Sequence, residues 1–218
     1  MKLMIISGSP KTEGICHSFV QIAQETALSC GAGADIVRLA DMGLTTCEMC
    51  GDGWGICYSE HICKHGAKDG FNNLLEKIRE ADAFIFVTPV YWGEPSEAFK
   101  IFLDKLRRTQ GTKVWDARED QVTYLNGKPI IVVASAGGGG GGTGSTFEYI
   151  ERAITHMEGK PWVFGGIFDY IAVNRWNQEY KRQTLKEAVK EMTRLWTSGL
   201  IEKNLHMWYK SGIIDKSM

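Results

Sequence analysis

The fold is decided by the stretch AFIFVTPVYWG at residues 83–93, where a fully apolar run leads into a small aromatic loop. An apolar run without alternation indicates a strand that is buried on both faces, as in parallel sheets. Tyr91 and Trp92 directly after this strand suit a planar ring, although an aromatic pair is more often part of a core. Gly93 lets the backbone approach such a ring closely. The stretch therefore predicts a buried strand that ends in a binding loop.

The same alternation of strand and helix extends along the chain on both sides of this stretch. Further apolar runs predict strands at Leu3–Ile6, Ile36–Leu39 and Pro129–Ala134, and a last one that begins at Trp162. Helical spacing of apolar residues predicts helices over 15–29, 71–78, 95–106, 147–157 and 185–196, with Pro95 in a first turn. Residues 109–127 show no periodicity. The alternation predicts one α/β domain over residues 1–218, a five-stranded parallel sheet with helices on both faces.

Composition narrows the class of protein. The 218 residues are 44% hydrophobic and 23% charged, with a net charge of −1 and both signs scattered along the chain. No basic stripe suggests a nucleic-acid or membrane partner. Residues Met1–Ile6 are too few for the apolar region of a signal peptide, and no run of about twenty apolar residues occurs. A cytoplasmic location with reduced thiols is therefore expected.

Two further loops follow predicted strands. Residues 7–18 form a small polar loop that runs into a helix N-terminus, where backbone N–H groups can bind an anion. Neither glycine-rich nucleotide signature occurs there, which leaves a mononucleotide phosphate or a simply capped helix. Six consecutive glycines, Gly137–Gly142, follow Ser135 and Ala136 and can lie flat against a ligand or form a flexible connector. Ligands of open α/β sheets lie at the carboxyl ends of the strands, where these loops belong.

A loop at residues 44–69 holds most of the cysteines. Four thiols with the spacing C-x2-C-x6-C-x5-C are the candidate metal ligands Cys47, Cys50, Cys57 and Cys63. Four thiolates suit a [4Fe–4S] cluster, whereas structural zinc usually takes two separated C-x-x-C pairs and only one is present. A redox-active C-x-x-C pair and a loop without metal are the other readings. His61 and His65 are near enough to replace a ligand, but with four cysteines present they are expected to be bystanders.

These motifs resemble the NAD(P)H-dependent FMN reductase branch of the flavodoxin-like superfamily and, within it, the iron–sulfur flavoproteins. The resemblance rests on the loop 8–14, the segment 89–93, the helical segment 99–104 and the position of the cysteine cluster, and it covers roughly residues 1–200. It implies the strand order 2-1-3-4-5 and a non-covalently bound FMN.

The resemblance also implies which residues hold the cofactor. The first loop would bind the FMN phosphate through Ser9, Lys11, Gly14, Cys16, His17 and Ser18. Cys16 and His17 stand where the family commonly has Thr and Ser. The second and third loops would enclose the isoalloxazine ring through Pro89, Val90, Tyr91, Trp92, Gly93, Ser135, Ala136, Gly137 and Gly138.

The implied function is FMN-dependent oxidoreduction from NAD(P)H to a small acceptor such as a flavin or quinone, with no catalytic side chain assigned. An alternative is an iron–sulfur flavoprotein that carries FMN plus [4Fe–4S] and takes electrons from a ferredoxin-like partner. In those proteins the compact pattern is C-x2-C-x2-C, whereas six residues separate Cys50 from Cys57 here, and cluster-free members exist. A zinc-stabilised, non-catalytic binding module is the second alternative. The resemblance implies a homodimer or homotetramer.

Overall fold

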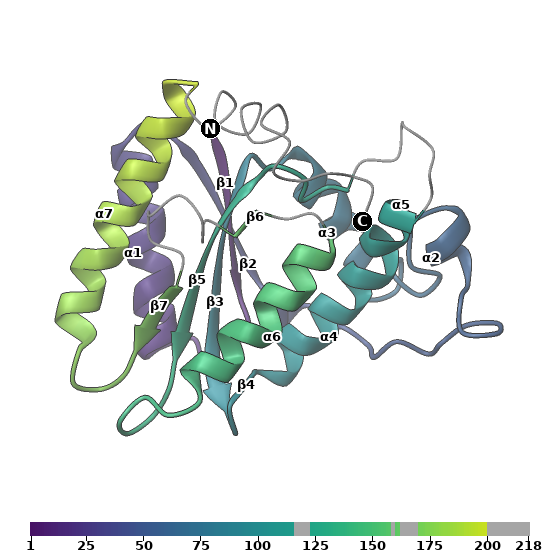
Figure 1. Ribbon diagram of the computed structural model, residues 1–218, viewed down its shortest axis with the longest axis horizontal. Coiled ribbons are helices and arrows are strands. Elements are labelled where there is room, and N and C mark those ends of the chain that lie inside the picture. Colours follow the sequence, from purple (N-terminus) through teal and green to yellow (C-terminus); the bar gives the residue numbers. More distant parts are fainter. Residues whose placement is uncertain (116–122, 158–159, 162–169, 200–218) are drawn as a thin grey trace, which may run out of the picture.

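The computed structural model describes residues 1–115, 123–157, 160–161 and 170–199 (Figure 1). Its strands are β1 (Lys2–Ser7), β2 (Gly33–Arg38), β3 (Ala83–Tyr91), β4 (Glu94–Pro95), β5 (Pro129–Ser135), β6 (Lys160–Pro161) and β7 (Tyr170–Val173). Its helices are α1 (Ile15–Ser29), the 3-10 helix η1 (Leu39–Asp41), α2 (Ile56–Ser59), α3 (Phe71–Glu80), α4 (Glu97–Leu106), the π-helix η2 (Arg107–Gly111), α5 (Thr112–Trp115), α6 (Thr143–His156) and α7 (Gln178–Thr197).

The strands form one sheet whose order is β2-β1-β3-β5-β6. β2, β1, β3 and β5 are mutually parallel neighbours, as the predicted order 2-1-3-4-5 requires. At the fifth position two short segments, β6 and β7, both run parallel to β5. The strand predicted to begin at Trp162 lies outside the described residues. The sheet also gains an antiparallel pair that the sequence did not indicate, between β4 and the end of β3.

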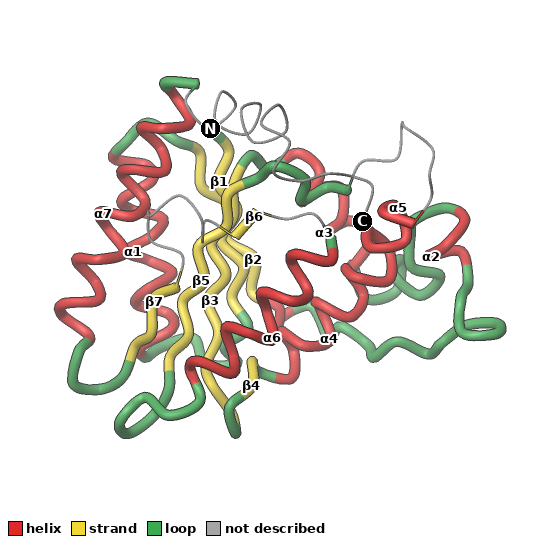
Figure 2. The backbone as a smooth tube through the Cα atoms, viewed as in Figure 1, coloured by secondary structure: helices red, strands yellow, loops and turns green. Residues whose placement is uncertain are grey.

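Alternate residues of each strand face two separate layers of helices. α1 and α7 cover one face of the sheet, and α3, α4 and α6 cover the other (Figure 2). Phe84 and Phe86 of β3 pack against Phe99 and Phe102 of α4, with 5.5 Å between the ring centroids of Phe86 and Phe99. Each buried phenylalanine contributes about 1.5–3 kcal/mol to stability through removal of apolar surface from water. The apolar run that predicted β3 is therefore buried on both faces.

The boundaries of two segments differ from the prediction. α4 begins at Glu97 rather than Pro95, because the hydroxyl of Ser96 accepts a hydrogen bond from the Phe99 N–H at 3.4 Å and caps the helix. Pro95 lies in β4 instead. The region from residue 109, which shows no periodicity, continues α4 through η2 into α5. In the described part of the chain, no helix combines the length and apolarity needed to cross a membrane.

Candidate functional site

Three loops leave the carboxyl ends of neighbouring strands and meet at one edge of the sheet, at the bottom of Figure 1. The first loop (residues 8–14) follows β1, the second loop (residues 88–93) comprises the end of β3 and the turn after it, and the third loop (residues 136–142) follows β5. This is the edge at which open α/β sheets bind ligands. The structure therefore brings together the three segments that the sequence singled out.

The first and second loops are joined at Gly8. The Gly8 N–H donates to the Val87 carbonyl at 2.8 Å, and the Ser96 hydroxyl donates to the Gly8 carbonyl at 2.6 Å. A Cβ atom at Gly8 would lie 2.6 Å from the Ser96 Oγ and 2.8 Å from the Phe99 Cβ. Only glycine permits this approach of the first loop to α4. Ser96 thus caps α4 and fixes the first loop at once.

The second loop contacts the third loop and the first turn of α6. The Ser145 hydroxyl donates to the Gly93 carbonyl at 2.6 Å. A Cβ atom at Gly142 would lie 2.6 Å from the Gly93 Cα and 3.0 Å from its N. Gly93 and Gly142 both have positive φ, 82° and 84°, which side chains disfavour. The last glycine of the run is thus an ordered contact of the second loop.

The Cys16 thiol is buried in the first turn of α1. Burial raises the pKa of Cys16 to about 11, although hydrogen bonds with Ser135 and Ser9 act in the opposite direction. The side chain is 7% exposed and belongs to the core between the sheet and α1. The structure places Cys16, expected at the phosphate, in this core at the start of α1.

The N-terminus of α1 has the features of an anion site. Its N-cap is Gly14, with a positive φ of 100°, and no side chain of the described residues caps the first turn. That turn also lacks an acidic residue, so its backbone N–H groups and the positive end of the helix dipole remain available. Lys11 is exposed beside it, and His17 is half-buried. The Ser18 hydroxyl donates to the Ile15 carbonyl at 2.8 Å, which leaves the backbone as the main donor.

The second loop presents aromatic surface beside open space. Trp92 is fully exposed with a positive φ of 54°, an unusual backbone conformation for a bulky residue, and Tyr91 is 50% exposed. Pro89 and Val90 are half-buried below them. Cβ atoms at Gly137 and Gly138 would meet no heavy atom of the described residues within 4 Å. An uncapped helix, exposed rings and a glycine loop without side chains fit FMN, with its phosphate and planar ring.

The cysteine loop forms a second candidate site beside α4. All six cysteines are free thiols, and Cys47, Cys50, Cys57 and Cys63 line one cavity of about 30 Å³. The structure therefore brings together the four predicted ligands. Among the residues that the structure describes, however, no three His, Cys, Asp or Glu side chains already converge on one metal position. The donor set fits a thiolate-bound group, and the loop would have to tighten around it.

Residues of α3 and α4 fix the ends of the cysteine loop. The Asp69 carboxylate is buried, forms an ion pair with Lys105, and accepts hydrogen bonds from the Thr45 N–H and hydroxyl, both at 3.0 Å. Burial raises the pKa of Asp69, but hydrogen bonds from Lys105, Thr45 and Phe71 outweigh it and hold this pKa below its usual value. The Asn72 side chain bonds both backbone groups of Cys63 at 3.0 Å.

The two histidines near the cysteines differ in position. His65 lines the cavity, and its Nε2 lies 3.2 Å from a carboxylate oxygen of Glu48. His61 is buried, with its Nδ1 3.1 Å from the Thr112 hydroxyl of α5. Of these two histidines, only His65 borders the cavity.

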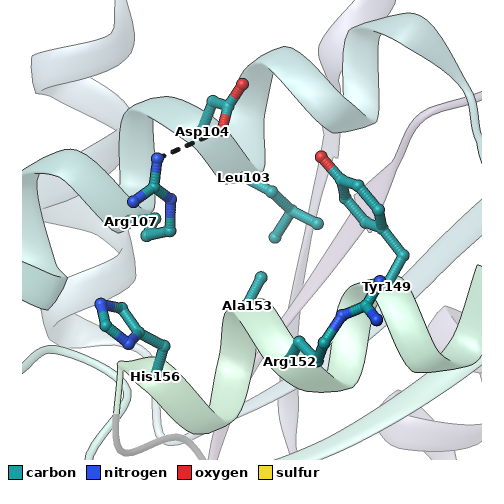
Figure 3. A pocket seen from close by; sticks show the side chains of 7 residues that line it. All are labelled: Leu103, Asp104, Arg107, Tyr149, Arg152, Ala153 and His156. Atoms are coloured by element: carbon teal, nitrogen blue, oxygen red, sulfur yellow. Dashed lines mark ion pairs between the residues drawn. The ribbon is translucent and has the colours of Figure 1, made fainter.

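The larger hollows of the surface lie elsewhere. One of about 300 Å³ lies between α4 and α6, and its lining includes Arg107, Arg152 and His156 (Figure 3). Another, of about 430 Å³, lies between β2 and α3. Neither is lined by residues of the three loops. The volume of a hollow therefore does not identify the three loops as the candidate flavin site.

Sequence reasoning missed several residues that build these sites. Ser96 carries a local signal, since a serine three residues before Phe99 at the start of an apolar helix is a typical N-cap. Gly142 was noted only as part of the glycine run. The pair of Lys105 with Asp69 and the contact of Arg108 with the cysteine loop join residues far apart in sequence, for which no local signal exists.

Solved structures define the class of protein. The chain is similar to RosB with a bound 8-demethyl-8-formylriboflavin-5'-phosphate intermediate, with a TM-score of 0.63 and 13% sequence identity. The match covers 100% of this chain and 89% of the RosB chain. It has a TM-score of 0.57 and 14% identity to an FMN-dependent NADH-azoreductase from Bacillus anthracis in complex with FMN, over 89% and 99% of the two chains. The match to a WrbA-like flavodoxin from Agrobacterium tumefaciens has a TM-score of 0.56 and 17% identity, and it covers 89% of this chain and 96% of that one. These likenesses show the flavodoxin-like fold.

The sequence then defines the family. Residues 1–161 match the model of the NADPH-dependent FMN reductase family, to which the chain belongs. Relatives include an iron–sulfur flavoprotein of Methanocaldococcus jannaschii, 34% identical over 107 residues, 49% of this chain and 52% of the relative. Another, from Methanosarcina thermophila, is 30% identical over 105 residues, 48% and 52% of the two chains. The chain spans about half the length of these relatives. The expected family, fold and FMN cofactor are confirmed.

Proposed function

We propose that the chain is an oxidoreductase that uses FMN to carry electrons from NAD(P)H to a small-molecule acceptor such as a flavin or quinone. The observation that carries this proposal is the meeting of three interlocked loops around an uncapped helix N-terminus and exposed aromatic side chains. Membership of the NADPH-dependent FMN reductase family supports the same chemistry.

Each loop has a distinct task in this proposal. The backbone N–H groups at the start of α1, assisted by Lys11, bind the phosphate. Tyr91 and Trp92 pack against the ring, and Gly137 and Gly138 let the backbone lie along its other side. Bound FMN supplies hydride and single-electron transfer, while the protein supplies position and electrostatics. No side chain is assigned as acid, base or nucleophile, because hydride transfer to a flavin does not require one from the protein.

Flavin binding by the purified protein tests this proposal, with two exposed aromatic residues as a pair. Trp92 follows β3 at the flavin edge, whereas Tyr58, which is 51% exposed, lies in α2 of the cysteine loop. Quenching of FMN fluorescence should show a several-fold weaker Kd for Trp92→Ala, since ring packing is worth about 0.5–1.5 kcal/mol, and a wild-type Kd for Tyr58→Ala. NADPH and NADH are then mixed anaerobically with the FMN-loaded protein, and loss of the oxidised flavin absorbance is followed. A colourless protein that stays free of added FMN would refute the function.

A specific observation favours an additional redox centre in the cysteine loop. Four free thiols line one cavity, and two relatives that are 30–34% identical to the matched half of this chain are named iron–sulfur flavoproteins. We therefore propose that Cys47, Cys50, Cys57 and Cys63 bind a [4Fe–4S] cluster, with a ferredoxin-like protein as the electron donor in that case. Iron and acid-labile sulfide are measured after anaerobic purification. About four irons per chain support the cluster, and stoichiometric zinc without sulfide refutes it.

The proposed assembly is a homodimer or homotetramer. Trp92, fully exposed at the flavin edge, would be partly covered by a second copy. Light scattering after size-exclusion chromatography gives the mass directly, and the mass of a single chain at micromolar concentration would refute this assembly.

A further inference from the structure

Arg107 and Arg108, adjacent residues of η2, line two different hollows. The Arg108 side chain lines the cysteine cavity. The Arg107 side chain lies instead on the hollow between α4 and α6, where its guanidinium is 3.7 Å from a carboxylate oxygen of Asp104 (Figure 3). η2 is a π-helical turn, a feature that is frequent at functional sites. The pair offers a local comparison of the same side chain inside and outside the cavity.

Arg108 contacts the part of the cysteine loop that departs from the compact family spacing. Six residues, 51–56, separate Cys50 from Cys57. The Arg108 guanidinium donates to the Gly53 carbonyl at 2.8 Å and lies 4.5 Å from the centroid of the Trp54 ring. A planar guanidinium can hydrogen-bond and stack at once, which a lysine cannot do. The inserted residues are therefore tied to α4 and η2 through one side chain.

Arg108 also brings to the cavity a positive charge that is not paired with a carboxylate of the described residues. Lys105, the other cation on this wall, is paired with Asp69, and Glu48 lies beside His65 across the cavity. Lys64 lines the cavity from the loop itself. Within the described residues, no carboxylate forms an ion pair with Arg108. A group bound by four thiolates carries net negative charge, and its reduction adds one more.

We propose that Arg108 is a positioning residue for a thiolate-bound cluster in this cavity, where it holds residues 51–56 in place and favours the reduced, more negative state. This role rests on the proposed cluster and adds to it the residue that compensates for the longer spacing. The charge of Arg108 acts from the cavity wall, so its removal shifts the equilibrium between reduced and oxidised cluster by about tenfold. For a one-electron couple, that corresponds to about 59 mV.

The test uses the full chain, loaded with FMN and reconstituted anaerobically with iron and sulfide. Wild type, Arg108→Gln, Arg108→Lys and Arg107→Gln are compared. Iron and sulfide per chain report on cluster retention, and a dithionite titration followed by electron paramagnetic resonance gives the midpoint potential of the cluster. Neither measurement depends on turnover.

The proposal expects a lower potential and faster loss of iron in Arg108→Gln, and wild-type values in Arg107→Gln. Arg108→Lys should restore most of the potential, because it keeps the charge, but not the retention of iron, because it cannot stack on Trp54 and donate to Gly53 together. Equal potentials in Arg108→Gln and Arg107→Gln overturn the role, even if Arg108→Gln loses iron faster through a loosened loop. A wild-type chain that takes up no iron and sulfide overturns both the cluster and this role, while bound FMN would show that the flavin function stands.

Discussion

The contact between Gly142 and Gly93 predicts that a single methyl group can separate the second and third loops. In Gly142→Ala, the new Cβ would lie 2.6 Å from the Gly93 Cα, 3.0 Å from the Gly93 N and 3.2 Å from the Val90 Cγ1. Two of these three atoms are backbone, so no flexible side chain can move aside. The φ of 84° at Gly142 adds a conformational penalty for alanine.

The magnitude follows from two terms. An L-residue in the left-handed region costs roughly 1–2 kcal/mol, and forcing a methyl group into a packed contact costs about 1–3 kcal/mol. Together they predict a loss of about 2–5 kcal/mol in the free energy of unfolding, unless the loops move apart. Movement would relieve the clash but would open the flavin site, so the affinity for FMN should then fall by at least about tenfold.

The assay pairs urea unfolding of the flavin-free protein with an FMN titration. Gly141→Ala is the matched control, because Gly141 adjoins Gly142, lacks a positive φ, and its Cβ would meet no heavy atom within 4 Å in the described part of the chain. That variant should unfold within about 0.5 kcal/mol of wild type and bind FMN normally. Equal stability and equal FMN affinity in the two variants would show that the loop contact is not rigid and refute the reasoning.

Three further predictions concern residues that join distant segments. Ser96→Ala removes the cap of α4 and leaves the buried end of the first loop without its donor; urea unfolding should show a loss of about 1–3 kcal/mol, and an unchanged midpoint would contradict this. Lys105→Met leaves the buried Asp69 carboxylate without its cation and should lower the free energy of unfolding by about 3–5 kcal/mol at pH 7, most of which Lys105→Met/Asp69→Asn should recover. Because the pKa of Asp69 is lowered in the folded state, its stabilisation is present above pH about 4 and is lost as the pH falls through that lowered pKa. Asp69→Asn should therefore show a shallower acid dependence of the unfolding free energy. Burial raises the pKa of Cys16 to about 11, so iodoacetamide at pH 8 should alkylate exposed Cys47 and spare Cys16; mass spectrometry that finds equal labelling would count against this burial.

Local patterns were enough to predict most of the fold and the general location of the site. The apolar run of β3, the polar turn before α1 and the glycine run before α6 are each encoded in consecutive residues. Because parallel strands place their carboxyl ends at one edge, the order of elements already implied that these loops meet. The cysteine spacing likewise indicated a second candidate site, which the structure shows as one cavity.

The sequence by itself therefore determined the alternating α/β fold and the segments that form the two sites, since these depend on periodicity and turn chemistry among near neighbours. The family followed from the resemblance of its motifs. Only the tertiary structure decided how the segments are held. Ser96 fixes Gly8, 88 residues away, and Arg108 fixes Gly53, 55 residues away. Such contacts depend on the packing of α4 against the sheet. This packing places the N-cap of α4, Ser96, at the flavin loops, and it places η2, which continues α4, beside the cysteines. Periodicity shows which face of a helix is buried, but the distances across that face arise only when the chain is folded.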